Sequence, residues 1–431
     1  MHPVTEPALD RSYRALLAVP SLGRILLGMQ IARIGQAMIG VALVLFTLST
    51  YRSPALAGFV TFASIFPGLL VSPIAGALLD RHGRTRLIVL DLLVALGSLV
   101  LIGGLSVAGL LPAWLLVLIA AVSSLTALLS ATGLRSLFPL IVPRHLWERV
   151  NAVDSNGYVV ATILGPPLAA VLVQVWGGPP ALVVIGLLFG IAALVFLRAP
   201  DPRTETASSG RLLVDAWQGL VYAWRNRTIR GIGISLSVLN LAGGMTTIVI
   251  PLIILERLRL DAALVGLVFA VQGLTGVVSG FLAGRIDTRG RERPMIVLPM
   301  FAMTGGVLLA LPALGAEPGV GLLFLVLAMA WTGIVNGPLD IALFTVRQRR
   351  TDPAWMGRAF AISMSFNYSG FPIGSALTGW LVGHSLDLAI IFGALACVAA
   401  SLLALWLVPG EDEAGPEPEL LADARADSSG S

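Results

Sequence analysis

Long apolar runs occupy most of this chain and constrain its fold more than any other feature. A helix crosses the hydrocarbon core of a bilayer, about 30 Å thick, with about 20 residues, whereas the strands of a membrane barrel are much shorter. Backbone N–H and C=O groups in lipid must be bonded within the segment, so these runs predict transmembrane helices. Twelve such runs lie near residues 22–49, 54–78, 87–109, 113–138, 150–175, 180–198, 231–255, 262–284, 295–315, 319–345, 358–383 and 387–408.

Charge is sparse and of one basic type. Of the 431 residues 56% are hydrophobic and 12% are charged, about half the roughly 25% of a soluble domain. All 28 basic residues are Arg, and the formal net charge is +4. The arginines gather in alternate loops, which are cytoplasmic if the N-terminus is, as the positive-inside rule requires. We therefore expect the bilayer as a partner, no nucleic acid, and both termini in the cytoplasm.

A short polar sequence between two apolar runs occurs twice. Asp80-Arg81-His82-Gly83-Arg84 returns 207 positions later as Asp287-Thr288-Arg289-Gly290-Arg291. A second landmark has nearly the same offset, because Trp147 precedes Trp355 by 208 positions. The two offsets predict related halves, an organisation that many secondary transporters share.

The repeat divides the chain into five regions. A cytoplasmic N-terminal segment, 1–21, precedes a six-helix bundle at 22–198. A cytoplasmic linker at 199–230 carries Pro, Ser and Gly and then an amphipathic stretch near 212–224, expected to lie on the membrane face. A second six-helix bundle follows at 231–408. The acidic tail, 409–431, lacks apolar periodicity and is expected to be disordered.

The first polar loop resembles the signature loop between helices two and three of the major facilitator superfamily. The run from Gly76 to Arg86 carries the Gly, then Asp-Arg, then Gly-Arg of that pattern. The stretches 135–143 and 210–224 resemble the macrolide-efflux and enterobactin-exporter-like branch. The resemblance implies an all-α membrane protein with twelve transmembrane helices in two pseudo-symmetric six-helix bundles, the major facilitator fold, working by alternating access.

The resemblance also implies a conformational gate at the polar loops. Asp80 would face the positive N-terminal end of a helix in the other half, near residues 356–358, and so latch the cytoplasmic side. The second copy matches less well, because Thr288 replaces the first Arg. A plain turn flanked by topology-setting arginines is the alternative. The gate candidates are Gly76, Asp80, Arg81, Gly83, Arg84, Asp287, Gly290 and Arg291.

Ionisable side chains inside apolar helices are functional candidates, because each costs several kcal/mol unless it is paired or hydrated. Asp91 and Arg135 fall at similar depth, near the cytoplasmic ends of helices three and four, and we expect a buried, structural ion pair between them. Arg33 lies nine residues past Arg24, about 13 Å along a helix, near the membrane middle. Arg33 can bind an anionic substrate, balance a carboxylate in the cavity, or snorkel.

Asp154 and Asp340 are the candidates for proton coupling. They fall in helices five and ten, which line or flank the central cavity in the superfamily that the chain resembles. A carboxylate in such a place can take up and release a proton. The alternative is a cytoplasmic gate network, because Arg149 and Arg347 lie close in sequence.

Uncharged polar side chains within the runs can bind a ligand in a mostly apolar chamber, or hydrogen bond between helices. Gly165-Pro166-Pro167 resembles the Gly-Pro element of antiporters of the superfamily and predicts a close-packing point between the halves. The candidates for the substrate cavity are Arg33, Gln36, Asn240, Gln272, Asn336, Asn367 and Tyr368.

Catalytic and metal-binding patterns are lacking in the sequence. Cys397 is the single cysteine, the four histidines have no metal-ligand spacing, and no phosphate-binding loop follows a strand. We expect no enzyme, no metal and no cofactor. The sequence predicts a monomeric secondary transporter of the bacterial inner membrane that exports a drug-like or siderophore-like amphipathic compound, driven by the proton gradient. The alternatives are an importer of an anionic metabolite or nutrient, favoured by Arg33, and a membrane sensor or enzyme on the same scaffold.

Overall fold

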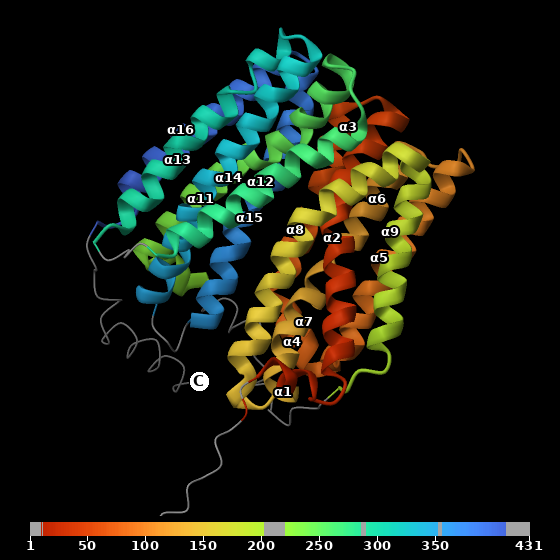
Figure 1. The fold of residues 1–431 in the computed structure, drawn as a ribbon, viewed down its shortest axis with the longest axis vertical. Helices are drawn as coiled ribbons and strands as arrows, with labels where there is room; N and C mark the ends of the chain where they lie inside the picture. The colour runs from red at the N-terminus through yellow and green to blue at the C-terminus, as the bar shows by residue number, and fades with distance from the viewer. Residues whose placement is uncertain (1–9, 11, 202–219, 286–289, 352–355, 411–431) are drawn as a thin grey trace, which may run out of the picture.

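The computed structural model describes residues 10, 12–201, 220–285, 290–351 and 356–410, and its regular elements in these ranges are helices. Two halves lie side by side in Figure 1, the first coloured red to yellow-green and the second green to blue. The first half contains α1 (Tyr13–Leu17), α2 (Leu22–Tyr51), α3 (Pro54–Ala63), α4 (Phe66–His82), α5 (Arg84–Val107), α6 (Ala113–Ser124), α7 (Ala127–Ile141), η1 (Arg144–Leu146), α8 (Trp147–Trp176) and α9 (Gly178–Phe196). The second half contains α11 (Arg227–Leu252), η2 (Ile253–Arg257), α12 (Ala262–Ala283), α13 (Glu292–Leu308), η3 (Pro312–Leu314), α14 (Pro318–Arg349), α15 (Met356–Val382) and α16 (Leu386–Leu407).

The predicted all-helical fold with its membrane spans is confirmed. Within the described ranges, 11 helical segments are long and apolar enough to cross a membrane. The remaining expected span corresponds to α15, which has 27 residues, about 40 Å of helix. Two spans are built from paired helices, α3 with α4 and α6 with α7.

The contacts between helices follow the predicted repeat. In the first half α2 packs against α8 and α9; in the second, α11 packs against α15 and α16. Between the halves, α8 packs against α12, and α15 packs against α3. These two contacts are equivalent, because the repeat offset carries α3 to α12 and α8 to α15. The halves are therefore related by a pseudo-two-fold axis between them.

Both paired-helix spans are interrupted where local chemistry disrupts the helix. Pro67 follows the first break and has no N–H to donate. At the second break, the hydroxyl of Ser124 donates back to the carbonyl of Ala121, a bond that competes with helical pairing. The two breaks meet, since the N–H of Gly68 donates to the Ser124 hydroxyl at 3.2 Å. An N–H left unpaired at the start of α4 thus finds its acceptor on the neighbouring span.

The halves meet closely at the end away from α1, the upper end of Figure 1. A Cβ atom on Gly266 of α12 would lie 2.5 Å from Cα of Pro167 of α8, so only glycine permits this approach. The predicted close packing of the Gly-Pro element between the halves is confirmed at Pro166 and Pro167, whereas Gly165 packs on Ala37 of its own half.

Several predicted features lie outside the described residues. They are residues 1–9 and 11 of the N-terminal segment, the linker from 202 to 219, Asp287 in the second polar loop, and the tail from 411. Of the amphipathic stretch, residues 220–224 are described and are helical, with Trp224 exposed.

Candidate functional site: a buried arginine and aspartate network in the first half

Arg33 of α2 and Asp154 of α8 form a buried ion pair. Nη2 of Arg33 lies 2.5 Å from Oδ1 of Asp154, and Nη1 donates to the backbone carbonyl of Asp154 at 2.6 Å. The two side chains are 9% and 11% exposed. Removing one partner of such a pair leaves an uncompensated charge in a low-dielectric interior. Of the three roles expected for Arg33, this geometry matches the balancing of a carboxylate.

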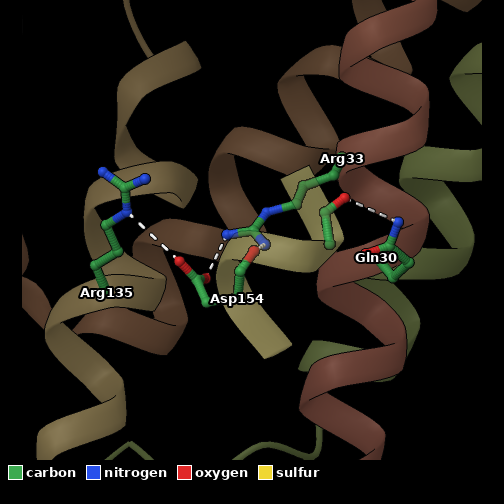
Figure 2. A network of polar contacts seen from close by, with 5 residues as sticks. Gln30, Arg33, Arg135 and Asp154 are labelled. Carbon is green, nitrogen blue, oxygen red and sulfur yellow. Dashed lines mark hydrogen bonds and ion pairs between the residues drawn. The ribbon is translucent and has the colours of Figure 1, made fainter. Parts of the chain in front are cut away.

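A glycine on α8 leaves room for two α2 side chains at this pair. Gln30, one turn before Arg33, donates from Nε2 to the carbonyl of Gly157 at 3.2 Å (Figure 2). A Cβ atom at Gly157 would lie 2.5 Å from Oε1 of Gln30 and 3.0 Å from Nη1 of Arg33. A larger residue at this position would displace the ends of these two side chains and disturb their contacts with α8.

A second arginine reaches the same carboxylate from α7. Nε of Arg135 lies 3.8 Å from Oδ2 of Asp154, and Figure 2 shows the carboxylate between the two guanidinium groups. Tyr158 contacts both cations: the guanidinium carbon of Arg33 lies 4.1 Å from its ring centroid, and that of Arg135 lies 5.3 Å away. Such cation–π contacts contribute about 0.5–2 kcal/mol each, depending on desolvation.

The network therefore has two positive groups for one negative group. Arg33 is enclosed, but the side chain of Arg135 is 63% exposed. Its 3.8 Å contact with Asp154 is long for a charge-assisted hydrogen bond, which is normally about 2.7–2.9 Å. The arrangement places the carboxylate of Asp154 between two cations and leaves one of them accessible beside an aromatic ring. This cation can bind an anionic or electron-rich group and can exchange between such a group and Asp154.

The expected ion pair between Asp91 and Arg135 is a prediction that the geometry corrects. Oδ2 of Asp91 accepts hydrogen bonds from the hydroxyl and from the backbone N–H of Ser130, the latter at 3.2 Å. Arg135 instead turns to Asp154 on α8. Asp91 and Arg135 have a similar predicted depth, but depth along a helix does not determine the face on which a side chain lies.

Asp340 of α14 is more accessible than Asp154. Its carboxylate is exposed, and Oδ2 accepts one hydrogen bond from Nδ2 of Asn336, one turn earlier, at 2.7 Å. Arg347 is buried two turns further along the same helix, with Nη1 3.6 Å from Sδ of Met364. Asp154 and Asp340 belong to different halves and do not share a hydrogen-bond network among the described residues.

The remaining uncharged candidates divide between helix packing and accessible surface. Asn240 donates from Nδ2 to the carbonyl oxygen of Asn367 at 2.9 Å and to its Oδ1 at 3.3 Å, which joins α11 to α15. Tyr368 is 45% exposed and stacks on Phe371, with the ring centroids 5.5 Å apart. Gln272 is half-buried on α12. Gln36 lines a cavity inside the first half.

The start of the linker contacts the first polar loop through hydrogen bonds. Gly83, between α4 and α5, has φ +94°, and a Cβ atom there would collide with Oδ2 of Asp201. Oδ1 of Asp201 accepts the N–H of Thr85 at 3.1 Å, and the carbonyl of Pro200 accepts the Thr85 hydroxyl at 2.8 Å. A carboxylate at the first turn of α5 is favoured by the positive end of the helix dipole.

The latch itself lies beyond the described side chains. Gly76 and Asp80 belong to α4, but their surroundings fall outside the described part, as do the side chains at the start of α15. Arg81 is exposed and Arg84 is half-buried. In the second loop Gly290 has φ +69° with open space around it, and Arg291 is exposed. The latch between Asp80 and α15 stays a prediction.

Three contributing residues were not predicted from the sequence. Tyr158 lies one helical turn after Asp154, and its position on the same helix face was the signal available. Gly157 gave no signal, since a helical glycine has many roles. Asp201 follows the last apolar run of the first half, but the sequence does not indicate that the chain folds back onto Gly83.

Two related six-helix halves, with charged side chains buried among the helices and the pseudo-symmetry axis between them, define a helical membrane transporter. The sequence profile described as Major Facilitator Superfamily matches residues 25–375, with a further match at 232–428. The chain belongs to the major facilitator superfamily, whose members are transporters and not enzymes.

Its relatives include transporters named for efflux. The chain is 36% identical over 405 residues to the uncharacterized MFS-type transporter y4rN of Sinorhizobium fredii, covering 92% of this chain and 97% of that protein. It is 27% identical over 400 residues to the multidrug efflux pump Tap of Mycobacterium tuberculosis, covering 85% and 89%. It is 21% identical over 362 residues to macrolide efflux protein A of Streptococcus pyogenes, covering 81% and 86%.

Solved structures with low sequence identity have the same fold. The nucleoside transporter NupG has a TM-score of 0.70 at 12% identity, covering 89% of this chain and 98% of that one. A bacterial homologue of the iron transporter ferroportin, in an inward-facing state, has a TM-score of 0.68 at 15% identity, covering 89% and 97%. At these identities the likeness extends to the fold alone.

Proposed function

We propose that this chain exports an amphipathic, drug-like or siderophore-like compound from the bacterial cytoplasm in exchange for protons. Two relatives that cover most of the chain are named as efflux proteins, one for multiple drugs and one for macrolides. Both termini lie in the cytoplasm in this proposal, with the arginine-rich loops. The mostly apolar helices suit a lipophilic substrate better than a sugar, whose hydroxyls would need a denser polar lining.

The contrast between two carboxylates is the observation that carries the coupling mechanism. Asp154 accepts hydrogen bonds from Arg33, and its second carboxylate oxygen lies 3.8 Å from Nε of Arg135. Two cations therefore compensate the negative charge of its carboxylate. Asp340 is exposed, and its one hydrogen bond to a described side chain comes from the neutral amide of Asn336. A carboxylate that is accessible and lacks a tightly bound cation can exchange a proton with water. We therefore assign the proton carrier to Asp340 and retain Asp154 as a charge-network residue.

Transport follows by rocking of one half against the other. In the described conformation the halves pack at the end away from α1, through α8 with α12 and α3 with α15. In our proposal this end is periplasmic, so the conformation is open to the cytoplasm. Opening to the periplasm requires these contacts to separate and the cytoplasmic ends of the two halves to come together. The polar loop at Gly83 lies at that cytoplasmic end and moves with α4 and α5.

Import of an anionic nutrient, the alternative that Arg33 favoured, has less support. The side chain of Arg33 is 9% exposed and its guanidinium is bonded to Asp154, so it is not available to a substrate without breaking that pair. Arg135 is the accessible cation and lies beside Tyr158. An acidic group on an otherwise lipophilic compound could still bind there, which is compatible with export.

Inside-out membrane vesicles with an imposed pH gradient test this proposal. We expect accumulation of ethidium, erythromycin or a catecholate siderophore when the vesicle interior is acidic, and none without the gradient. Asp340→Asn should abolish gradient-driven accumulation but retain exchange of labelled for unlabelled compound, because exchange needs no net proton movement. Asp387→Asn is the matched control, since this exposed carboxylate lies in the first turn of α16, at the very end of its span.

Three results would contradict the proposal. Accumulation driven equally by either orientation of the gradient, or by neither, would remove proton antiport. Gradient-driven transport at the wild-type rate in Asp340→Asn would remove the proposed carrier. An Asp154→Asn variant that behaves like the expected Asp340→Asn, with exchange intact, would transfer the role to Asp154.

A further inference from the structure

A cavity of about 50 Å³ lies inside the first half, lined by α2, α5, α6, α7 and α9 and by the end of α3. A site for one water-sized group needs roughly 10–15 Å³, so a few waters, or an ion with waters, fit. None of Arg33, Arg135 and Asp154 lines this cavity. Its polar lining consists of Gln36, Ser64, Asp91, Ser98, Ser123 and Ser124.

Asp91 brings a buried negative charge to this cavity. Asp91 is 5% exposed. It accepts two hydrogen bonds from Ser130, and both end on the same oxygen, Oδ2. Neither α6 nor α9, which also line the cavity, contains a charged residue. On α2, α4 and α7, the remaining helices that line the cavity or pack against α5, the ionisable residues are Arg24, Arg33, Arg81, His82 and Arg135, besides Asp80. Arg33 and Arg135 are held by Asp154, and Arg24 donates to the carbonyl of Arg198.

The other polar groups offer oxygen atoms to the same space. The side chains of Gln36, Ser98 and Ser123 line the cavity and make no hydrogen bond to another described residue, whereas the backbone carbonyl of Ser123 accepts one from Thr126. The hydroxyl of Ser64 donates to the carbonyl of Thr61 at 2.9 Å, which leaves its oxygen lone pairs unused. One carboxylate and several neutral oxygens are the ligands that hard cations take in proteins.

The break between α6 and α7 adds to this arrangement. Ser123, Ser124 and Ala127 line the cavity on either side of the break. Interrupted helices within transporter bundles commonly form the coordination sites of small cations, because their free ends supply polar backbone groups inside the membrane. A single carboxylate neutralises a single positive charge, which favours a monovalent over a divalent ion. Gln36 is exposed whereas Asp91 is buried, so an ion can enter past Gln36.

We propose that this cavity binds one sodium ion, with Asp91 as the charged ligand and Ser98, Ser123 and Gln36 as neutral oxygen ligands. The bound ion compensates the charge of Asp91 inside the bundle and gives partners to side chains that otherwise have none. It also joins α2, α5 and α6 at the helix break. This site is independent of the exported compound and of the role of Asp340.

Binding of radioactive sodium to the purified full-length protein in detergent tests the site, with choline replacing sodium at constant ionic strength. We expect saturable binding of one ion per chain that unlabelled Na⁺ displaces better than K⁺. Asp91→Asn should abolish it, and Ser98→Ala or Ser123→Ala should each weaken it by about tenfold. Asp340→Asn is the matched control, a carboxylate in the other half that should leave sodium binding unchanged.

Lack of saturable binding by the monodisperse wild-type protein would overturn the proposal, as would wild-type binding in Asp91→Asn. If Asp91→Asn does not yield folded protein, the double variant Ser98→Ala, Ser123→Ala decides the matter, because it keeps the charge and removes two ligands. Equal binding by that folded variant and by wild type would refute the site. The assay uses no transported compound and no pH gradient, so its result is separate from that of the export test.

Discussion

At the scale of single residues, the ion pair of Arg33 and Asp154 governs the stability of the first half. Arg33→Ala should destabilise the protein by about 3–5 kcal/mol, because it leaves Asp154 buried without its cation. Arg33→Ala with Asp154→Ala should recover much of this loss, since no buried charge is then left unpaired and Arg135 is exposed. Thermal unfolding of the purified protein in detergent, followed by intrinsic fluorescence, measures both variants.

Arg135→Ala is the matched control for that experiment. Arg135 carries the same charge and reaches the same carboxylate, but it is 63% exposed and 3.8 Å away. Exposed pairs contribute about 0–1 kcal/mol, so its unfolding temperature should stay close to that of wild type. Equal destabilisation by Arg33→Ala and Arg135→Ala would show that burial does not distinguish the two contacts.

At the scale of helices, the turn between α4 and α5 depends on Gly83, which Asp201 at the start of the linker contacts. Gly83→Ala should lower the unfolding temperature, because φ is +94° and the added Cβ meets the carboxylate of Asp201; unfavourable backbone conformations of this kind cost about 1–3 kcal/mol. Gly290→Ala in the second loop is the matched control. It also has positive φ, at +69°, but nothing lies within reach of a Cβ there.

A second substitution separates the contact with Asp201 from the backbone strain. Adding Asp201→Ala to Gly83→Ala should remove the collision and restore part of the lost stability, while the backbone strain remains. If Gly83→Ala and Gly290→Ala have the same unfolding temperature, the close contact between Asp201 and Gly83 is contradicted.

The sequence predicted the spans and the repeat well, because both depend on properties that are read along the chain. The length of an apolar run fixes whether it can cross a bilayer, and the offset between Asp80 and Asp287 fixes the relation of the halves. The contacts between residues of different helices depend on how each helix is rotated about its own axis. The sequence does not state this rotation directly. Asp91 was therefore paired wrongly with Arg135, and Tyr158 was missed beside Asp154. The helix breaks were also missed, since Pro67 and Ser124 act through contacts between two spans.

At the scale of the whole molecule, transport requires the two halves to change their contact. One contact between them is suited to a covalent test: the hydroxyl oxygens of Ser72 on α4 and Ser365 on α15 lie 2.9 Å apart. Cysteines at these positions would bring two sulfur atoms close to the distance of a disulfide, about 2.05 Å. The one native cysteine, Cys397, is buried within the second half and can be replaced by serine for this purpose.

The most direct test of alternating access is the transport rate of Ser72→Cys, Ser365→Cys in a Cys397→Ser background, measured in inside-out vesicles with the compound that wild type transports fastest. Oxidation should join the halves and stop transport, reduction should restore it, and each single-cysteine variant should be insensitive to oxidant. Transport that continues at the reduced rate after complete disulfide formation, quantified by mass spectrometry, would contradict the account, because the halves would not need to move apart at this contact.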